Sequence, residues 1–139
     1  MKLFRILVSF ALVIALMSFT ARAQEQKSPE QQEKEMREAI EKELDKYIRT
    51  LDLDLAQEFY VDSILTHDYF AMREELMEKS RAKVSNSDVY VAIQDKWAER
   101  IYVAFRKVLD DGQWEKYLKG GAARDTKARD KRAAKRSAQ

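Results

Sequence analysis

Apolar residues recur along most of the chain at spacings of three and four, the pattern of amphipathic helices. The first stripe consists of Met36, Ile40, Leu44, Tyr47 and Leu51. Ser28 before it can cap a helix, and Pro29 suits the first helical position. Gln31 stands where the partner residue of a capping box is expected. The pattern therefore predicts a first helix over residues 28–51.

A second, longer stripe follows a break at residues 51–54. Asp54 fits an N-cap, and Gln57 stands three residues later. We expect a helix from Leu55 to about Lys83, which at 1.5 Å per residue is over ~40 Å long. Its stripe is Val61, Leu65, Tyr69, Met72 and Leu76. Further apolar residues widen the surface: Phe59, Tyr60, Ile64, Phe70 and Met77.

The turn-forming segment 85–88 separates this helix from the next. The third stripe is Tyr90, Ile93, Trp97, Ile101, Ala104 and Val108. Asp110 is the next candidate cap, with Gln113 three residues later, and Gly120 and Gly121 end a short fourth helix. No strand pattern stands out, so we predict an all-α fold of three to four antiparallel helices that includes a long helical hairpin.

Residues 119–139 have a different composition from the helices before them. They contain no large apolar residue, so they cannot bury a core. We expect a basic, mobile tail, either disordered or partly helical. From Lys119 onward there are 8 basic and 2 acidic residues, a net charge of +6, whereas residues 24–118 hold 15 basic and 22 acidic residues, net −7. An acidic body thus carries a basic tail.

The tail offers cations to a polyanion. These are Arg124, Lys127, Arg129, Lys131, Arg132, Lys135 and Arg136. Anionic lipid, lipopolysaccharide or acidic unfolded proteins are the expected partners, and nucleic acid is not. A solubilising tail that rests on its own acidic body is an equal alternative.

The N-terminus has the pattern of a secretory signal. Lys2 and Arg5 precede an uncharged, mostly apolar run over residues 6–19, and Ala21-Arg22-Ala23 supplies the small residues of a cleavage site. The run is shorter than the roughly 20 residues that span a bilayer, so cleavage before Gln24 is favoured over a retained anchor. We expect a periplasmic protein with residues 24–118 as one helical domain. The 139 residues include no cysteine, so neither disulfides nor a lipidated cysteine are available.

The two helix starts share a motif. Leu53, Asp54 and Gln57 recur later in the chain, at the same spacing, as Leu109, Asp110 and Gln113. In each copy a leucine precedes the helix, an aspartate caps it, and a glutamine can reach back to the cap. Taken alone, these are two ordinary helix starts.

In an exported all-helical chain of this length, the repeated motif resembles the Spy/CpxP family of periplasmic proteins, the LTxxQ group, over roughly residues 30–118. Asp stands in both copies where the family has Thr, and it caps a helix equally well. The segments 61–65, 105–109 and 113–118 look like those of Bacteroidetes-type members. The resemblance implies long antiparallel helices, a homodimer, and a role as an ATP-independent chaperone or a stress-signalling inhibitor; some relatives bind metals.

The sequence offers little catalytic or metal-binding chemistry. His67 is the only histidine, and although Ser63 can share its helix face, adjacent Asp68 is expected to point elsewhere. Carboxylates at helical spacing, such as Asp95 and Glu99, could bind a hard cation weakly, but a solvated acidic face is the ordinary interpretation. We predict no enzyme activity, no cofactor and no metal site.

The leading hypothesis is an ATP-independent holdase that binds unfolded envelope proteins through shallow apolar and charged patches. The candidate contacts to clients or to a second subunit are Phe59, Tyr60, Phe70, Met72 and Met77. A regulatory protein that docks on one partner and a metal-stress protein are the alternatives.

Overall fold

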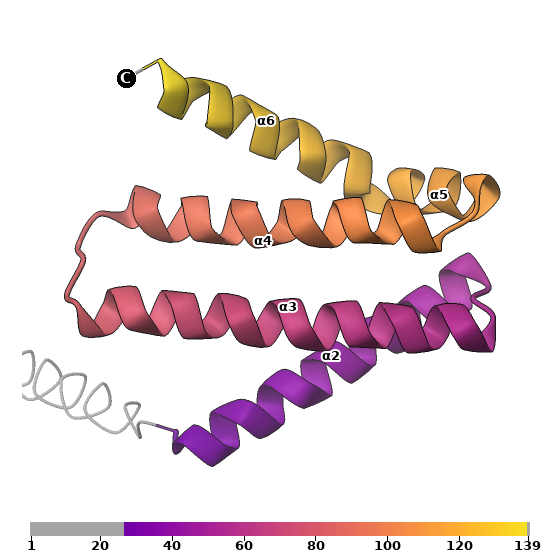
Figure 1. The fold of residues 1–139 in the computed structure, drawn as a ribbon, viewed down its shortest axis with the longest axis horizontal. Helices are drawn as coiled ribbons and strands as arrows, with labels where there is room; N and C mark the ends of the chain where they lie inside the picture. Colours follow the sequence, from indigo (N-terminus) through magenta and orange to yellow (C-terminus); the bar gives the residue numbers. More distant parts are fainter. Residues whose placement is uncertain (1–26, 139) are drawn as a thin grey trace, which may run out of the picture. The chain divides into compact units, whose positions relative to one another are not determined.

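The computed structural model describes residues 27–138, so the expected signal peptide and cleavage site lie outside the described residues. Every regular element within them is helical, which confirms the all-α prediction (Figure 1). The elements are α2 (Pro29–Leu51), α3 (Leu55–Arg81), α4 (Ser87–Val108), α5 (Asp111–Tyr117), the π-helical turn η1 (Leu118–Ala122) and α6 (Ala123–Ser137). Among these helices, none combines the length and the apolar character that crossing a bilayer requires.

The chain divides into two compact units between Glu35 and Met36, within α2. In the first unit Ser28 and Gln31 form the expected capping box. The Gln31 N–H donates to the Ser28 hydroxyl at 3.2 Å, and the Ser28 N–H donates to the Gln31 side chain at 3.1 Å. Lys27 also pairs with Glu35 at 2.8 Å. The first helix thus begins where its capping signals predict.

In the second unit, α3 and α4 form the predicted long hairpin and run antiparallel side by side (Figure 1). The turn begins with a Schellman motif, in which Lys83 adopts a left-handed conformation with φ 54°. The Val84 N–H donates to the Lys79 carbonyl at 3.1 Å, and the Lys83 N–H donates to that of Ser80 at 2.9 Å. Asn86 then caps α4. The hairpin therefore turns at residues whose local hydrogen bonds end one helix and begin the next.

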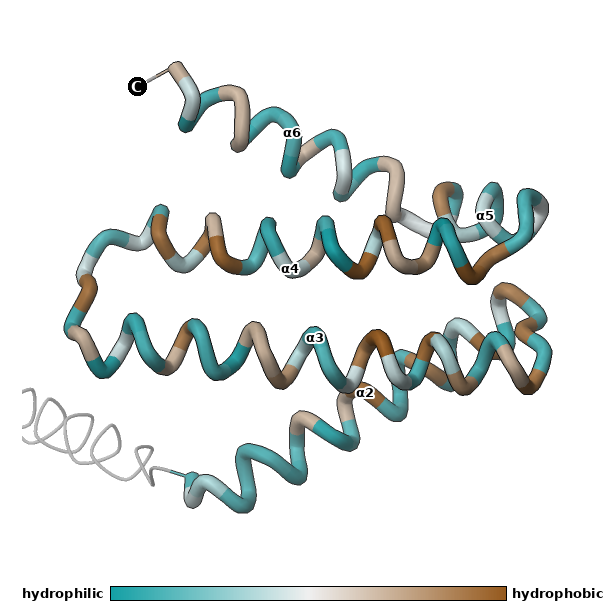
Figure 2. The backbone as a smooth tube through the Cα atoms, viewed as in Figure 1, coloured by the Kyte–Doolittle hydropathy of each residue, from teal (hydrophilic) through white to brown (hydrophobic). Residues whose placement is uncertain are grey.

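The core lies where the second half of α2 crosses the hairpin near its open end. Leu51 and Leu53 flank the α2–α3 turn, and Val61, Leu65 and Phe105 are completely buried between the helices. The Phe105 ring meets those of Tyr47 and Tyr117 with centroids 5.2 Å apart in both cases. Figure 2 shows the brown, hydrophobic positions of α3 concentrated toward this end of the hairpin, whereas α4 carries them at both of its ends.

The tail differs from the sequence-based expectation. Residues 123–137, expected to be mobile and either disordered or partly helical, form one continuous helix, α6. The backbone bends before it at Gly121, whose φ of 126° falls in a region that favours glycine. In Figure 2 α6 shows only teal and pale segments, in keeping with its lack of large apolar residues. Its position beside α4 depends on charged side chains instead.

Candidate functional site

The two copies of the repeated motif contact each other. Gln57 Nε2 donates to Gln113 Oε1 at 2.7 Å, and Gln113 Nε2 donates to Gln57 Oε1 at 2.9 Å. Each amide also donates to the carbonyl that precedes the leucine of the other motif, Gln57 to Val108 at 3.0 Å and Gln113 to Asp52 at 3.3 Å. The arrangement is therefore reciprocal, although the two halves lie far apart in the sequence.

Both capping boxes are complete at the same time. Gln57 Oε1 accepts from the Asp54 N–H at 3.1 Å, and Gln113 Oε1 accepts from the Asp110 N–H at 3.0 Å. The aspartate carboxylates accept in return from the Gln57 and Gln113 N–H groups, each at 2.8 Å. All four hydrogen-bonding positions of each amide are occupied. The motif fixes the two helix starts against each other and leaves neither amide free for a ligand.

A groove of about 750 Å³ runs between α3 and α4 on the surface of the hairpin. Its apolar lining comes from Tyr60 and Ile64 on α3 and from Val103, Ala104 and Val108 on α4. Its volume falls within the ordinary range of ligand-binding clefts.

At one end, the groove continues into exposed apolar side chains. We call Leu55, Phe59, Tyr60 and Val103 the apolar patch; their exposed fractions are 83%, 69%, 56% and 46%. The rings of Phe59 and Tyr60 contact each other with centroids 5.7 Å apart, and Tyr60 also lines the groove. The patch and the groove therefore share Tyr60 and Val103, and Phe59 adjoins them through its contact with Tyr60.

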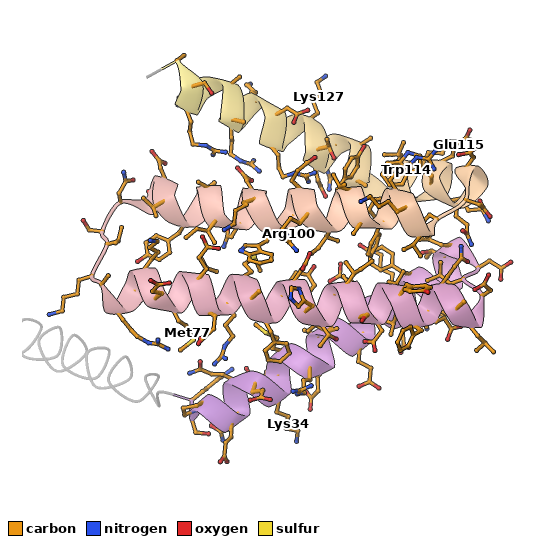
Figure 3. The ribbon with its side chains drawn as sticks, in the orientation of Figure 1. Lys34, Met77, Arg100, Trp114, Glu115 and Lys127 are labelled. Atoms are coloured by element: carbon orange, nitrogen blue, oxygen red, sulfur yellow. The ribbon has the colours of Figure 1, made fainter. Side chains whose placement is uncertain are left out.

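The other candidate contact residues lie elsewhere. Phe70 packs against the core and carries the Arg37 guanidinium 4.9 Å from its ring centroid. Met72 lines a separate cavity beneath α6. Met77 is half-buried on the side of α3 that faces away from α4 (Figure 3). Of the five candidates, only Phe59 and Tyr60 belong to the apolar patch.

Charged side chains border the groove. Arg100 lies between α3 and α4 (Figure 3), with its guanidinium 4.9 Å from the Trp97 ring centroid and 3.7 Å from the Asp68 carboxylate. Lys107 lines the groove from α4 and forms no ion pair within the described residues. Asp68 and Glu99 line the groove as well, so charged groups of both signs flank an apolar floor.

The expectation that Asp68 points away from His67 was wrong. Asp68 is buried, and its Oδ1 lies 2.7 Å from His67 Nδ1. Helix geometry normally separates adjacent side chains, but here Asp68 turns inward between α3 and α4 while the exposed imidazole folds back to it. Ser63 also lines the groove, and no hydrogen bond joins it to His67 in the described part of the chain. A catalytic triad needs that hydrogen bond between the nucleophile and its base, so this set lacks the required geometry.

Of the seven cations expected in the tail, six separate onto two faces of α6. Arg132 makes two hydrogen bonds to Asp95, at 3.0 and 2.6 Å, and Arg136 donates to the same carboxylate at 3.1 Å. Arg129 donates to Glu99 at 2.9 Å and lies over the Tyr102 ring. We call these three arginines, at spacings of three and four, the arginine face.

The remaining cations face solvent. Lys127 points away from α4 (Figure 3), and Lys131 and Lys135 follow at spacings of four. They are exposed and form no ion pair within the described residues, and we call them the lysine face. Arg124 pairs with neighbouring Asp125 at 3.1 Å. Only part of the predicted polyanion-binding set is therefore free to meet a partner.

A second cavity, of about 360 Å³, lies where α6 meets the body. The hydroxyls of Tyr47 and Tyr69 both donate to the Glu43 carboxylate there, at 3.0 and 2.9 Å. Burial, with the adjacent Glu43 charge, raises the pKa of both tyrosines well above the ordinary value. Burial also raises the pKa of Tyr117 to about 12. These rings therefore remain neutral and give the cavity an aromatic surface, beside the carboxylates of Glu43 and Asp125.

Within residues 27–138 no cluster of three or more potential ligands is arranged to hold a metal ion. Comparison of the chain with family models, with curated proteins and with solved structures finds no match.

Proposed function

We propose that this protein is an ATP-independent holdase of the bacterial envelope, related to the Spy/CpxP family, that binds unfolded polypeptides. The observation that carries the proposal is the apolar patch, because Leu55 and Phe59 are more exposed than any other large hydrophobic side chain described. Exposed apolar side chains grouped beside a groove are typical of interaction sites. The border of the groove carries charges of both signs, Arg100 and Lys107 beside Asp68 and Glu99, which suits the polar and charged segments of varied clients.

The shape of the site suits weak and varied contacts. Full burial of one large apolar side chain is worth roughly 1.5–3 kcal/mol, and an open groove buries only part of each. Four such side chains therefore hold a client weakly, after the cost of immobilising it. Weak contacts with many segments permit release without nucleotide hydrolysis.

The experiment is light scattering of unfolded clients that aggregate on dilution, with the mature protein at stoichiometric amounts and without nucleotide. Several unrelated clients are used. The expected result is slower aggregation of all of them. No effect on any client would contradict the proposal.

Two matched variants connect the activity to the patch. Phe59→Ser with Val103→Ser removes two exposed apolar side chains, and we expect suppression to fall by at least half. Glu74→Ser with Glu78→Ser is the control, because both residues lie on α3 away from the patch. Equal loss in the two variants would show that the patch is not the binding surface.

A homodimer belongs to the same proposal, since a second subunit is an alternative cover for the patch. Light scattering coupled to size exclusion measures the oligomeric state of the wild type and of the Phe59/Val103 variant. Dissociation in the variant would assign the patch to subunit contact.

A further inference from the structure

Helix α6 is held against the body by arginines rather than by apolar packing. Its docked side consists of the arginine face, and its other side chains are small or polar. Asp95 receives both Arg132 and Arg136, and Glu99 receives Arg129. Arginine suits this role because its planar guanidinium forms paired hydrogen bonds to carboxylates and stacks on rings.

The surface under α6 is complementary to arginine chemistry. Asp95 is buried and carries a charge that needs a partner; the hydrogen bond from Arg132, followed by that from Arg136, holds its pKa below the usual range. Glu99 lies one helical turn after Asp95 on α4, and Tyr102 follows it. The Tyr102 ring centroid lies 5.5 Å from the Arg129 guanidinium. Carboxylates and an aromatic ring thus follow one another along one side of α4.

Two features make the docking of α6 incomplete. Arg129 is buried, yet its Nε has no hydrogen-bond partner within the described residues. Beside it the 360 Å³ cavity remains between α6 and the tyrosines of the body. A buried guanidinium usually satisfies all its donors, so α6 occupies this surface without fitting it fully.

The connection to α6 allows it to leave. Gly120 and Gly121 precede it, and Gly121 takes a conformation that other residues rarely adopt. Ion pairs that are partly exposed are weak and are screened by salt, and Arg132 and Arg136 retain 45% and 35% of their side-chain exposure. The small side chains between the arginines offer little apolar contact to add to these pairs.

We propose that the surface of Asp95, Glu99 and Tyr102 is a docking site for arginine-rich helical segments of other polypeptides, and that α6 is its built-in competitor. The ligand chemistry is inferred from α6 itself, which presents arginines at spacings of three and four to these groups. This site is separate from the groove between α3 and α4, and the inference does not depend on the proposed holdase function.

A tethered competitor sets a threshold for binding. A segment joined by a short linker acts at an effective concentration on the order of 1 mM, and α6 follows directly on the short turn η1. An external segment therefore binds the wild type poorly unless it carries more arginines or a longer contact. Removal of the arginine face exposes the site to weaker partners.

The test uses a fluorescent synthetic peptide with the sequence of residues 122–138 and four full-length proteins. These are the wild type, the triple variant Arg129→Gln/Arg132→Gln/Arg136→Gln, the same triple variant with Asp95→Asn, and the control Lys127→Gln/Lys131→Gln/Lys135→Gln. The arginine triple variant and the lysine triple variant each remove three positive charges from α6. Only the arginine variant frees the docking surface. Fluorescence anisotropy measures peptide affinity at low salt, and circular dichroism verifies that each protein is folded.

We expect the arginine variant to bind the peptide at least ~10-fold more tightly than the wild type or the lysine control, given the effective concentration of α6. Asp95→Asn should reverse that gain. Equal affinity in the arginine and lysine variants would overturn the proposal, as would a gain that Asp95→Asn leaves intact.

A second measurement needs no change to the arginines. Because the chain contains no cysteine, Ser87→Cys and Ser137→Cys introduce two labelling sites, one on α4 and one on α6. Energy transfer between two dyes then reports whether α6 is docked. Unlabelled peptide at millimolar concentration should lower the transfer, and an unchanged signal at saturation would contradict competition for one surface.

Discussion

At the scale of single residues, the reciprocal contact between Gln57 and Gln113 explains why glutamine occupies both positions. A primary amide carries two donors and an acceptor oxygen with two lone pairs, so it can serve a helix cap, a distant carbonyl and a second amide at once. Glutamate in either place would supply no donor to the opposing carbonyl. The motif is therefore a tertiary contact as well as two helix caps.

The first prediction concerns this contact. Gln57→Ala and Gln113→Ala should each lower the free energy of unfolding by about 2–3 kcal/mol, because each leaves partners unsatisfied and removes a cap. The loss of unfolding free energy in the double variant should be clearly smaller than the sum of the two single losses, by a coupling energy of about 1–2 kcal/mol. Urea unfolding followed by circular dichroism measures all three values.

Gln31→Ala is the matched control for that cycle. Gln31 completes an exposed capping box, and its side-chain oxygen accepts from the Ser28 N–H as the other two glutamines accept from their caps. We expect a loss below about 1 kcal/mol. Additive losses at Gln57 and Gln113 would mean that their mutual hydrogen bonds contribute nothing to stability.

The two caps could be predicted from the sequence, but the contact between them could not. Asp54 and Asp110 cap their helices as predicted, since capping depends on residues three positions apart. Gln57 and Gln113 are far apart in the chain, and local helix geometry does not say whether two such distant residues meet. The signal that could have indicated the contact was the identity of the two motifs, since equal leucine–glutamine spacing lets each amide reach the carbonyl before the other leucine.

At the scale of elements, the three long helices followed their apolar stripes, and α3 ends at Arg81, two residues before the expected end. Helix α6 was expected only in part, as a tail that is partly helical or rests on the acidic body, because it has no apolar stripe to fix its limits or its partner. Its partners Asp95 and Glu99 stand much earlier in the chain, on α4, where they had been interpreted as a solvated acidic face. The separation of arginine and lysine onto two faces was the feature of the sequence that could have indicated docking.

The second prediction concerns the bend before α6. Gly121→Ala should strain the backbone at φ 126° by roughly 1–3 kcal/mol and lower the energy transfer between labels on α4 and α6. Gly120→Ala is the control, because a Cβ there meets open space. If both substitutions leave the transfer unchanged, the glycine conformation does not set the position of α6.

The third prediction is that acid releases α6. The hydrogen bond from Arg132 lowers the pKa of Asp95 from 3.8, so its contribution to docking is present above that value and is lost as pH falls through the lower, folded value. Energy transfer between the α4 and α6 labels should therefore decrease below about pH 4. Arg136 also faces Asp95, and Lys96, Glu99 and Asp130 border the same contact.

Asp95→Asn is the control for the acid response. It should weaken docking already at pH 7 and remove the acid response that Asp95 contributes. A wild-type signal that stays constant in acid until the whole protein unfolds would show that Asp95 does not hold α6 in place.

At the scale of the whole molecule, docking redistributes the charge that the sequence alone shows as a basic tail on an acidic body. The arginine face is neutralised against α4, whereas the lysine face remains exposed. Docked α6 therefore turns its lysine face, with lysines four residues apart, outward as a positive surface. Such a surface would attract an anionic membrane without any change in the fold of the body.

The fourth prediction tests that surface with vesicles that contain anionic lipid at low salt. Each lysine near such a membrane contributes about 1 kcal/mol, so the lysine triple variant should bind on the order of 10- to 100-fold more weakly than the wild type. The arginine triple variant removes the same charge, but from groups that already have carboxylate partners. Its affinity for the vesicles should therefore fall by less than ~10-fold. Sedimentation of the protein with vesicles at two salt concentrations measures both. Equal losses would mean that α6 leaves α4 and binds the membrane with both faces, which would make membrane binding and docking alternative states of one helix.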